Sequence, residues 1–305
     1  MRKIVGFFAL FLINEIAFAQ VADTSIFRYP IQMDSVVVKA IRSGWDLQAF
    51  IRRMQKDTSF HKAFHNLHLV SFQAKNEVWI YSPQGRVKAG MRSETVQKRE
   101  NGCRSLSTIS QKSTGDFFTK NGQYRYYTAA LFAYLFLETG PVCNESPYLP
   151  KAVNSSSGSR LARNKQTLKE LIFNPGSKIS GIPLLGKSTA IFDEANLACY
   201  DFRLEHDLQN GVDCYLFKAT AKPSCKSELV YQELDTWFRK SDYTILARNY
   251  ALHYSTVVYD FDLKLEVRLG YIDGLLIPVH VAYNGDWRIL MKGRELGSFL
   301  FDLKN

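Results

Sequence analysis

Residues 181–188 match the phosphate-binding motif G-x4-G-K-[ST] at every fixed position, with Lys187 and Ser188 at its end. In nucleoside-triphosphate enzymes the glycines let backbone N–H groups surround the phosphates, while the lysine and the hydroxyl contact the terminal phosphate and magnesium. The motif needs a buried hydrophobic strand in front of it, yet residues 176–180 are mostly polar. We therefore interpret the match as a chance resemblance and predict that the protein binds no nucleotide.

Three histidines, His61, His65 and His68, follow one another at spacings of four and three residues. On one helix they would share a face, and two of them could hold a metal ion. No acidic residue lies between them to serve as a base, unlike the H-E-x-x-H motif of metalloproteases. We predict a partly buried, hydrogen-bonded helix face and no metal or other cofactor.

Asp260, Asp262 and Glu266 alternate along one segment and could form a carboxylate pair of the kind that cleaves glycosides. Lys264 and Arg268 fall on the same face of the same strand, which favours a charged, solvated surface. The chain also lacks the G-x-S-x-G sequence of nucleophilic serine hydrolases. These patterns predict that the protein is not an enzyme.

The N-terminus has the three parts of a secretory signal peptide. Arg2 and Lys3 form a basic start, residues 4–13 are mostly apolar, and Ala17 and Ala19 give a small-x-small cleavage site. No cysteine follows that site to carry a lipid anchor, and no later segment is apolar enough to cross a bilayer. We expect cleavage after Ala19 and a periplasmic or secreted protein.

The composition, with 46% hydrophobic and 22% charged residues, is that of a folded protein. The formal charge is +10, and much of the excess lies between residues 151 and 191. Such a region attracts anionic lipid headgroups, and nucleic acid is not expected because no reading module is present. The residues that we expect to face headgroups are Lys151, Arg160, Arg163, Lys165 and Lys187.

Five cysteines follow the predicted cleavage site, and none of their spacings is that of a zinc ribbon or a thioredoxin-like pair. Disulfides persist in an oxidising compartment, but an odd number leaves one thiol unpaired within the chain. We expect one bridge, between Cys103 and Cys143, and we expect Cys199, Cys214 and Cys225 to be buried and reduced.

Residues 20–305 are expected to form one domain. Residues 34–67 have apolar residues at helical spacing, and the capping types at 57–59 predict a break into consecutive helices. Two strands are expected at 69–81 and 86–97.

An irregular, Ser-rich and basic insertion is expected at about residues 99–190, and residues 99–122 show no regular pattern. Within the insertion, residues 129–137 are nine apolar residues in a row, which predicts a helix that must be enclosed by protein. An amphipathic helix is expected at 160–173, before an Asn-Pro-Gly sequence.

The C-terminal part reads as long antiparallel strands. An Asn-Gly turn at 210–211 would place Leu204 opposite Phe217. Residues 257–271 alternate between apolar and charged side chains, which predicts one buried and one solvated face. Keeping apolar residues on one face favours a three-residue loop at 272–274 and a further turn at 284–286.

Several short segments between residues 199 and 299 carry a resemblance to a known family; they are Gly-Val-Asp-Cys-Tyr at 211–215, Asp-Thr-Trp-Phe at 235–238 with Asp242, Ala247-Arg248, Asp-Gly-Leu-Leu-Ile-Pro at 273–278, and Tyr-Asn-Gly-Asp-Trp at 283–287. This part resembles the outer-membrane lipoprotein-sorting protein superfamily, and also uncharacterised secreted proteins of Bacteroidetes. The resemblance implies an α+β fold, in which a strongly curved antiparallel sheet forms an open half-barrel with helices on its concave side. It also implies a cavity for lipid acyl chains and no catalytic group.

We therefore expect a lipid or another hydrophobic ligand, such as lipoprotein acyl chains, to bind within the half-barrel. The large apolar side chains on the expected inner face are the candidate contacts, namely Trp237, Phe238, Tyr259, Phe261 and Trp287. The alternative is a secreted structural or protein-interaction module whose core is filled and which binds no ligand.

Overall fold

The computed structural model describes residues 47–143, 169–177, 189–255, 259–289 and 293–304, all of which belong to one compact unit that spans residues 37–305. The predicted signal peptide at 1–19 and the phosphate-motif match at 181–188 lie outside the described residues. The same holds for the residues expected to face headgroups, which are Lys151, Arg160, Arg163, Lys165 and Lys187.

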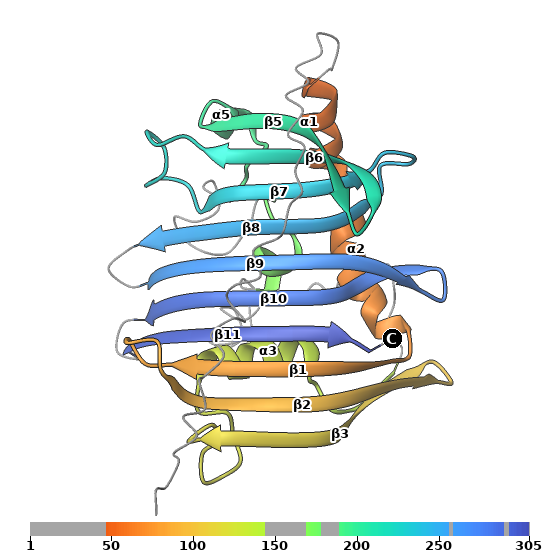
Figure 1. The fold of residues 1–305 in the computed structure, drawn as a ribbon, viewed down its shortest axis with the longest axis vertical. Helices are drawn as coiled ribbons and strands as arrows, with labels where there is room; N and C mark the ends of the chain where they lie inside the picture. The colour runs from red at the N-terminus through yellow and green to blue at the C-terminus, as the bar shows by residue number, and fades with distance from the viewer. Residues whose placement is uncertain (1–46, 144–168, 178–188, 256–258, 290–292, 305) are drawn as a thin grey trace, which may run out of the picture. The chain divides into compact units, whose positions relative to one another are not determined.

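An 11-stranded antiparallel sheet dominates the described residues, in the order β4-β3-β2-β1-β11-β10-β9-β8-β7-β6-β5 (Figure 1). The first and last strands pair in its middle, and β4 and β5 are its two open edges. The strands are β1 (Phe72–Tyr81), β2 (Val87–Glu100), β3 (Cys103–Gly115), β4 (Gly140–Cys143), β5 (Tyr200–Gln209), β6 (Val212–Ala221), β7 (Tyr231–Arg239), β8 (Ile245–Ser255), β9 (Tyr259–Ile272), β10 (Leu275–Ile289) and β11 (Gly293–Leu303).

Few helices accompany this sheet, so the described part of the chain is mostly β, although we expected an α+β fold. They are α1 (Leu47–Lys56), α2 (Ser59–Asn66), the short 3-10 helix η2 (Leu67–Leu69), α3 (Tyr127–Phe136) and α5 (Glu194–Leu197). Residues 169–173 are also helical. Figure 1 shows α2 and α3 crossing behind the strands, and we call that side the helix-bearing face.

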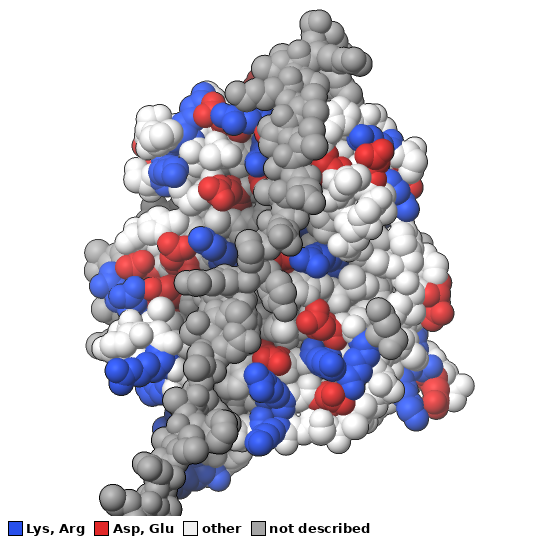
Figure 2. All heavy atoms as spheres, in the orientation of Figure 1, with Lys and Arg blue, Asp and Glu red and all other residues white. Residues whose placement is uncertain are grey.

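Alternation along the strands separates the helix-bearing face from the outer face, as expected for β9. Phe261, Leu263, Leu265 and Val267 are buried, while the charged residues between them point to the other side. Figure 2 views this outer face, where acidic and basic side chains are interspersed.

Aromatic side chains fill the space between the helices and the sheet. Phe50 of α1 packs edge-on against Phe238, with 5.1 Å between the ring centroids. Phe132 of α3 stacks on Phe299 at 4.2 Å. α3 confirms the apolar helix predicted at residues 129–137, although one of its residues, Tyr134, is 42% exposed.

The breaks between helices have local causes. Asp57 lies between α1 and α2, and its carboxylate accepts hydrogen bonds from the backbone N–H and the hydroxyl of Ser59, at 3.2 and 2.6 Å. The predicted interruption at 57–59 is therefore confirmed.

The start of α3 is capped by a side chain from the sheet. The Glu295 carboxylate of β11 accepts hydrogen bonds from the backbone N–H groups of Tyr127 and Thr128, at 2.9 and 2.7 Å.

The turn at Asn210 and Gly211 is confirmed as a two-residue hairpin. Both residues have positive φ, 50° and 78°, as a type I′ turn requires. Leu204 lies opposite Phe217, as the register test predicted.

The loop between β9 and β10 differs from the prediction. Its turn contains only Asp273 and Gly274, so Leu269 lies opposite Pro278. A β-bulge at Val279 then shifts the register and returns Val281 to the buried face. The prediction of a three-residue loop at 272–274 was therefore wrong, because the β-bulge within β10 corrects the register instead.

The turn expected at 284–286 was also wrong. β10 runs through Gly285 without interruption, and Tyr283 pairs with Leu265 rather than with Trp287. The Tyr283 side chain occupies the space where a Cβ of Gly285 would lie, so this glycine admits an aromatic ring within a strand.

β3 occupies a region that we expected to be irregular. It pairs with β2 through a turn at Asn101 and Gly102, whose φ angles are 52° and 76°. Residues 107–115 of β3 are exposed on both faces, so they show no alternation between apolar and polar residues. That exposure explains why the sequence pattern missed the strand.

Two disulfides are present among the described residues. The expected bridge between Cys103 and Cys143 is confirmed, across the pair β3–β4. Cys199 and Cys225, predicted to be reduced, form a second bridge, because the β5–β6 hairpin brings its two ends together. Cys214 is buried and free.

Candidate functional site

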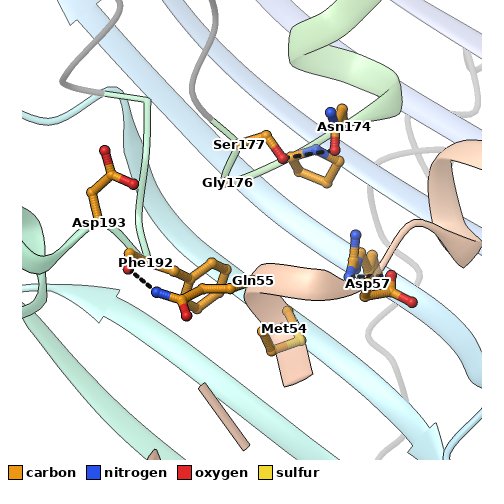
Figure 3. A pocket seen from close by; sticks show the side chains of 10 residues that line it. Met54, Gln55, Asp57, Asn174, Gly176, Ser177, Phe192 and Asp193 are labelled. Atoms are coloured by element: carbon orange, nitrogen blue, oxygen red, sulfur yellow. Dashed lines mark hydrogen bonds and ion pairs between the residues drawn. The ribbon is translucent and has the colours of Figure 1, made fainter. Parts of the chain in front are cut away.

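A polar pocket of about 250 Å³ lies on the helix-bearing face, where the junction of α1 and α2 meets β8 (Figure 3). Two further segments, the turn after residues 169–173 and the segment before α5, complete its wall. Its lining residues are Met54, Gln55, Asp57, Asn174, Pro175, Gly176, Ser177, Phe192, Asp193 and Arg248.

Arg248 of β8 is the central charge of this pocket. Its residue is only 4% exposed, and its Nη2 lies 3.3 Å from Oδ2 of Asp57. The guanidinium carbon lies 4.5 Å from the centre of the Phe60 ring, while Nε has no hydrogen-bond partner. Burial lowers the pKa of Arg248, and the nearby Asp57 carboxylate opposes that shift.

Two buried tyrosines form hydrogen bonds with the helical segment 169–173, which leads into the 174–177 turn. The Tyr231 hydroxyl donates to the carbonyl oxygen of Leu171 at 2.9 Å, and the Tyr250 hydroxyl donates to that of Ile172 at 2.5 Å. Burial raises the pKa of both phenols well above its usual range, so they remain neutral donors. They satisfy carbonyl groups at the end of a helical turn, which have no partner within the helix.

Two further polar contacts lie in the wall of the pocket. Gln55 donates from Nε2 to the carbonyl oxygen of Phe192 at 2.5 Å, and the Ser177 hydroxyl donates to Oδ1 of Asn174 at 2.7 Å. Figure 3 shows these two pairs on different sides of the pocket, with Asp193 pointing away from Gln55. The wall thus contains a buried cation, two carboxylates, two amides and a hydroxyl, and this set can bind a polar group by hydrogen bonds.

Three of the predicted ligand contacts lie in the core of the helix-bearing face. Phe238, Phe261 and Trp287 are 1–4% exposed, and the rings of Phe261 and Trp287 are 5.1 Å apart. The indole of Trp287 donates to the hydroxyl of Tyr283. None of the three is among the residues that line the polar pocket.

Trp237 lies on the outer face, so its predicted place on the inner face was wrong. It packs in a small separate cluster with Cys214, Leu216 and Ala247, and its indole donates to Oδ2 of Asp207 at 2.7 Å. The neighbouring Phe238 points to the opposite side, since successive side chains alternate along a strand. The side chain of Tyr259 lies outside the described residues.

The other candidate groups behave as structural elements. The rings of His61 and His65 are 4.7 Å apart, and His68 lies beyond them in η2. Burial lowers the pKa of His61. Across the described ranges, no group of three or more histidine, cysteine or carboxylate side chains could hold a metal ion.

The carboxylates of β9 face basic partners on the outer face, as predicted. Asp260 pairs with Arg288 at 3.0 Å, and Glu266 pairs with Arg268 at 2.5 Å. They therefore form ion pairs across and along the strands rather than a facing carboxylate pair.

Sequence reasoning did not single out Arg248 or Asp57 as site residues. A signal was present, because Arg248 occupies the same strand face as Tyr250 and Leu252, which are buried. A charged residue in such a row needs a partner. Its partner lies 191 positions away in the chain, so only the folded structure identifies it.

The solved structures that are similar to this chain include those of two proteins. One is a DUF1329 family protein from Desulfovibrio piger, 15% identical, with a TM-score of 0.22, covering 81% of this chain and 92% of that chain. The other is a putative outer membrane lipoprotein-sorting protein domain from Vibrio parahaemolyticus, 10% identical, with a TM-score of 0.25, covering 85% and 88%. No family model and no curated protein matches the chain.

Within the described ranges, no helix is both long enough and apolar enough to cross a membrane.

Proposed function

We propose that this protein is an exported, non-enzymatic binding protein for an amphipathic ligand, such as a lipid. The polar end of the ligand occupies the pocket at Arg248, and its apolar part lies against the aromatic residues of the helix-bearing face. One observation carries the proposal. A buried guanidinium with an unpartnered N–H lines a polar pocket at the margin of an aromatic core.

The energetics of the ion pair support a role in binding. Burying Arg248 and Asp57 removes hydration from both, and a well-packed apolar pair at such a site is often as stable. The pair is thus poorly explained by stability alone. Arg248 still has donors beyond the one directed at Asp57, and a guanidinium binds carboxylate or phosphate oxygens with strong, directional hydrogen bonds.

The pocket is large enough for a headgroup but not for a whole lipid. Its volume of about 250 Å³ falls below the roughly 300–1,000 Å³ of typical ligand pockets. The apolar part therefore needs room that opens between the helices and the sheet. Met54 and Phe192 line the pocket and also belong to the aromatic core, so the two regions are continuous.

A second candidate function is that of a protein-interaction module with a filled core. α3 favours it, because Phe132 stacks on Phe299 at 4.2 Å and Phe136 lies 5.2 Å from Phe301. These rings occupy the sheet surface on which an acyl chain would otherwise lie.

Two measurements separate these functions. Organic extracts of natively purified protein are analysed by mass spectrometry, and dodecanoate and dodecanol are titrated by calorimetry. We expect bound lipid, and dodecanoate affinity that falls at least about tenfold in Arg248→Met while dodecanol affinity changes little, because only dodecanoate has a charged end.

Arg288→Met is the matched control, since Arg288 is an exposed arginine that pairs with Asp260 on the outer face. Absence of extractable lipid together with no binding of either probe would reject the proposal and favour the filled core. Equal loss in Arg248→Met and Arg288→Met would reject the assignment of the headgroup to the pocket.

A further inference from the structure

The helices α1 and α2 have one apolar and one basic side. Phe50, Ile51 and Met54 of α1 and Phe60 and Phe64 of α2 are buried against the sheet. The exposed cations on the opposite side of the two helices are Arg52, Arg53, Lys56 and Lys62. The apolar side is used in the protein core, but exposed cations gathered in this way are attracted to the anionic lipids of a membrane surface.

No exposed carboxylate offsets these cations within the two helices. Asp57 is the one acidic residue between positions 47 and 66, and its side chain is 16% exposed and directed at Arg248. Within the described residues of α1 and α2, the exposed side therefore carries cations and no exposed carboxylate, unlike the outer face in Figure 2, where the two signs are interspersed.

The elements beside the helices contribute little net charge. In the turns next to α1, Lys240 pairs with Asp213 at 3.3 Å and Arg239 pairs with Asp242 at 3.0 Å. Beside α2, the charge of Glu170 raises the pKa of His61 and the charge of Lys169 lowers it, so the two charges oppose each other. Asp193, at the pocket, is another carboxylate among the described residues near α1.

The aromatic residue beside α1 suits a membrane interface. Tyr243 is half-buried, and the guanidinium carbon of Arg53 lies 4.2 Å from the centre of its ring. Its ring also stacks on Tyr215 at 5.8 Å. Tyrosine has an apolar ring and a polar hydroxyl, and it is enriched where protein meets the headgroup layer.

We propose that the exposed side of α1 and α2 docks on an anionic phospholipid bilayer. The polar pocket borders this surface, because Gln55 lines the pocket and is exposed next to Lys56. Docking by α1 and α2 places the pocket next to the headgroups. The inference goes beyond ligand binding and does not require it.

Vesicle flotation tests the docking with the full-length mature chain. Vesicles of phosphatidylcholine with 30% phosphatidylglycerol are compared with pure phosphatidylcholine, at low and high salt. We expect binding to the anionic vesicles only, weakened by salt because the attraction is electrostatic. Each cation near the surface changes the partition coefficient about fivefold, so Arg53→Gln, Lys56→Gln and Lys62→Gln together lower it by about 100-fold.

Two control variants make the assignment specific. Arg92→Gln, Lys264→Gln and Arg288→Gln remove the same charge from the outer face and should lower binding far less. Lys151→Gln, Arg160→Gln, Arg163→Gln and Lys165→Gln change the basic segment outside the described residues. A larger loss in either control than in the α1–α2 variant would overturn the inference, as would no binding to anionic vesicles.

A heparin or oligonucleotide column provides the last outcome. Retention that depends on Arg53, Lys56 and Lys62 without any vesicle binding would mean that the surface binds a different polyanion, and would overturn the membrane assignment. Dodecanoate titration of the α1–α2 variant without vesicles keeps the two proposals apart, because none of these three residues lines the pocket.

Discussion

The ion pair between Arg248 and Asp57 allows a double-mutant cycle with a calculable result. The single changes are Arg248→Met, which removes the buried cation, and Asp57→Asn, which removes the carboxylate charge. Asparagine keeps an oxygen that can accept the hydrogen bonds from Ser59, so the start of α2 is preserved. The cycle therefore changes the charge interaction with little change in helix geometry.

The structure sets the size of each effect. At a separation of 3.3 Å and an effective dielectric constant of about 20, the attraction between the two charges is about 5 kcal/mol. The side chain of Arg248 is 5% exposed and that of Asp57 is 16% exposed, so each charge is poorly hydrated when its partner is removed. Each single variant should therefore lose about 3–5 kcal/mol of unfolding free energy.

The double variant should be much less affected than the sum of the singles. With both charges removed no uncompensated buried charge remains, and we expect it to lie within about 2 kcal/mol of the unchanged protein. The coupling free energy between the two positions is therefore at least about 4 kcal/mol, because the two single losses add up to more than the loss in the double variant.

Urea unfolding followed by tryptophan fluorescence measures the cycle, with both disulfides kept oxidised and m-values compared among the four proteins. Additive single effects, or an Arg248→Met variant as stable as the unchanged protein, would refute the reasoning, because either result means that the pair is not a coupled buried ion pair. Loss of dodecanoate binding in the double variant at near-normal stability would then separate the binding role of Arg248 from its role in folding.

Three further predictions concern single positions. Burial raises the pKa of Asp235 from 3.8 to about 6. Between about pH 4 and pH 6 the folded state therefore binds the Asp235 proton more tightly than the unfolded state does, and the stability of the protein falls as the pH rises through this range. With its side chain 27% exposed, Asp235→Asn should be about 1–2 kcal/mol more stable at pH 7, an advantage that disappears toward pH 4 in urea titrations at several pH values. Gly285→Ala should lower the unfolding free energy in urea by about 1–3 kcal/mol, because the new methyl group meets the Tyr283 side chain. Gly90→Ala should cause a comparable loss, because its methyl group meets Trp79. Phe132→Ala should cost about 3–5 kcal/mol, since the ring is fully buried on Phe299, and unchanged stability would show that α3 does not pack there.

Sequence patterns predicted the strands in which buried and solvated side chains alternate along the chain. β9 has that pattern along most of its length, and the Asn210-Gly211 turn fixes its own register. β3 does not, because residues 107–115 are exposed on both sides and therefore carry no periodic signal. Alternation can report a strand only where one face is covered.

The register errors have a different cause. The bulge at Val279 and the uninterrupted course of β10 through Gly285 both depend on how β10 fits its neighbours, which no short window of sequence contains. Glycine and Asn-Gly are common in turns, but Gly285 is used to admit a tyrosine ring. The pairing of Cys199 with Cys225 follows from the β5–β6 hairpin, so it was deducible once that register was accepted.

The pocket and the aromatic core together constrain how a ligand could enter. Ring contacts already fill the apolar space under α3, so the entry of an acyl chain must first separate packed side chains such as Phe132 and Phe299. Polar contact at Arg248 needs no such separation, because the pocket has a volume of about 250 Å³ beside the junction of α1 and α2. Headgroup contact should therefore precede insertion of the chain, and its free energy would offset part of the cost of opening the core. Dodecanoate should accordingly bind before the tryptophan fluorescence, to which Trp287 contributes, changes, and a single phase in stopped-flow measurements would contradict this order.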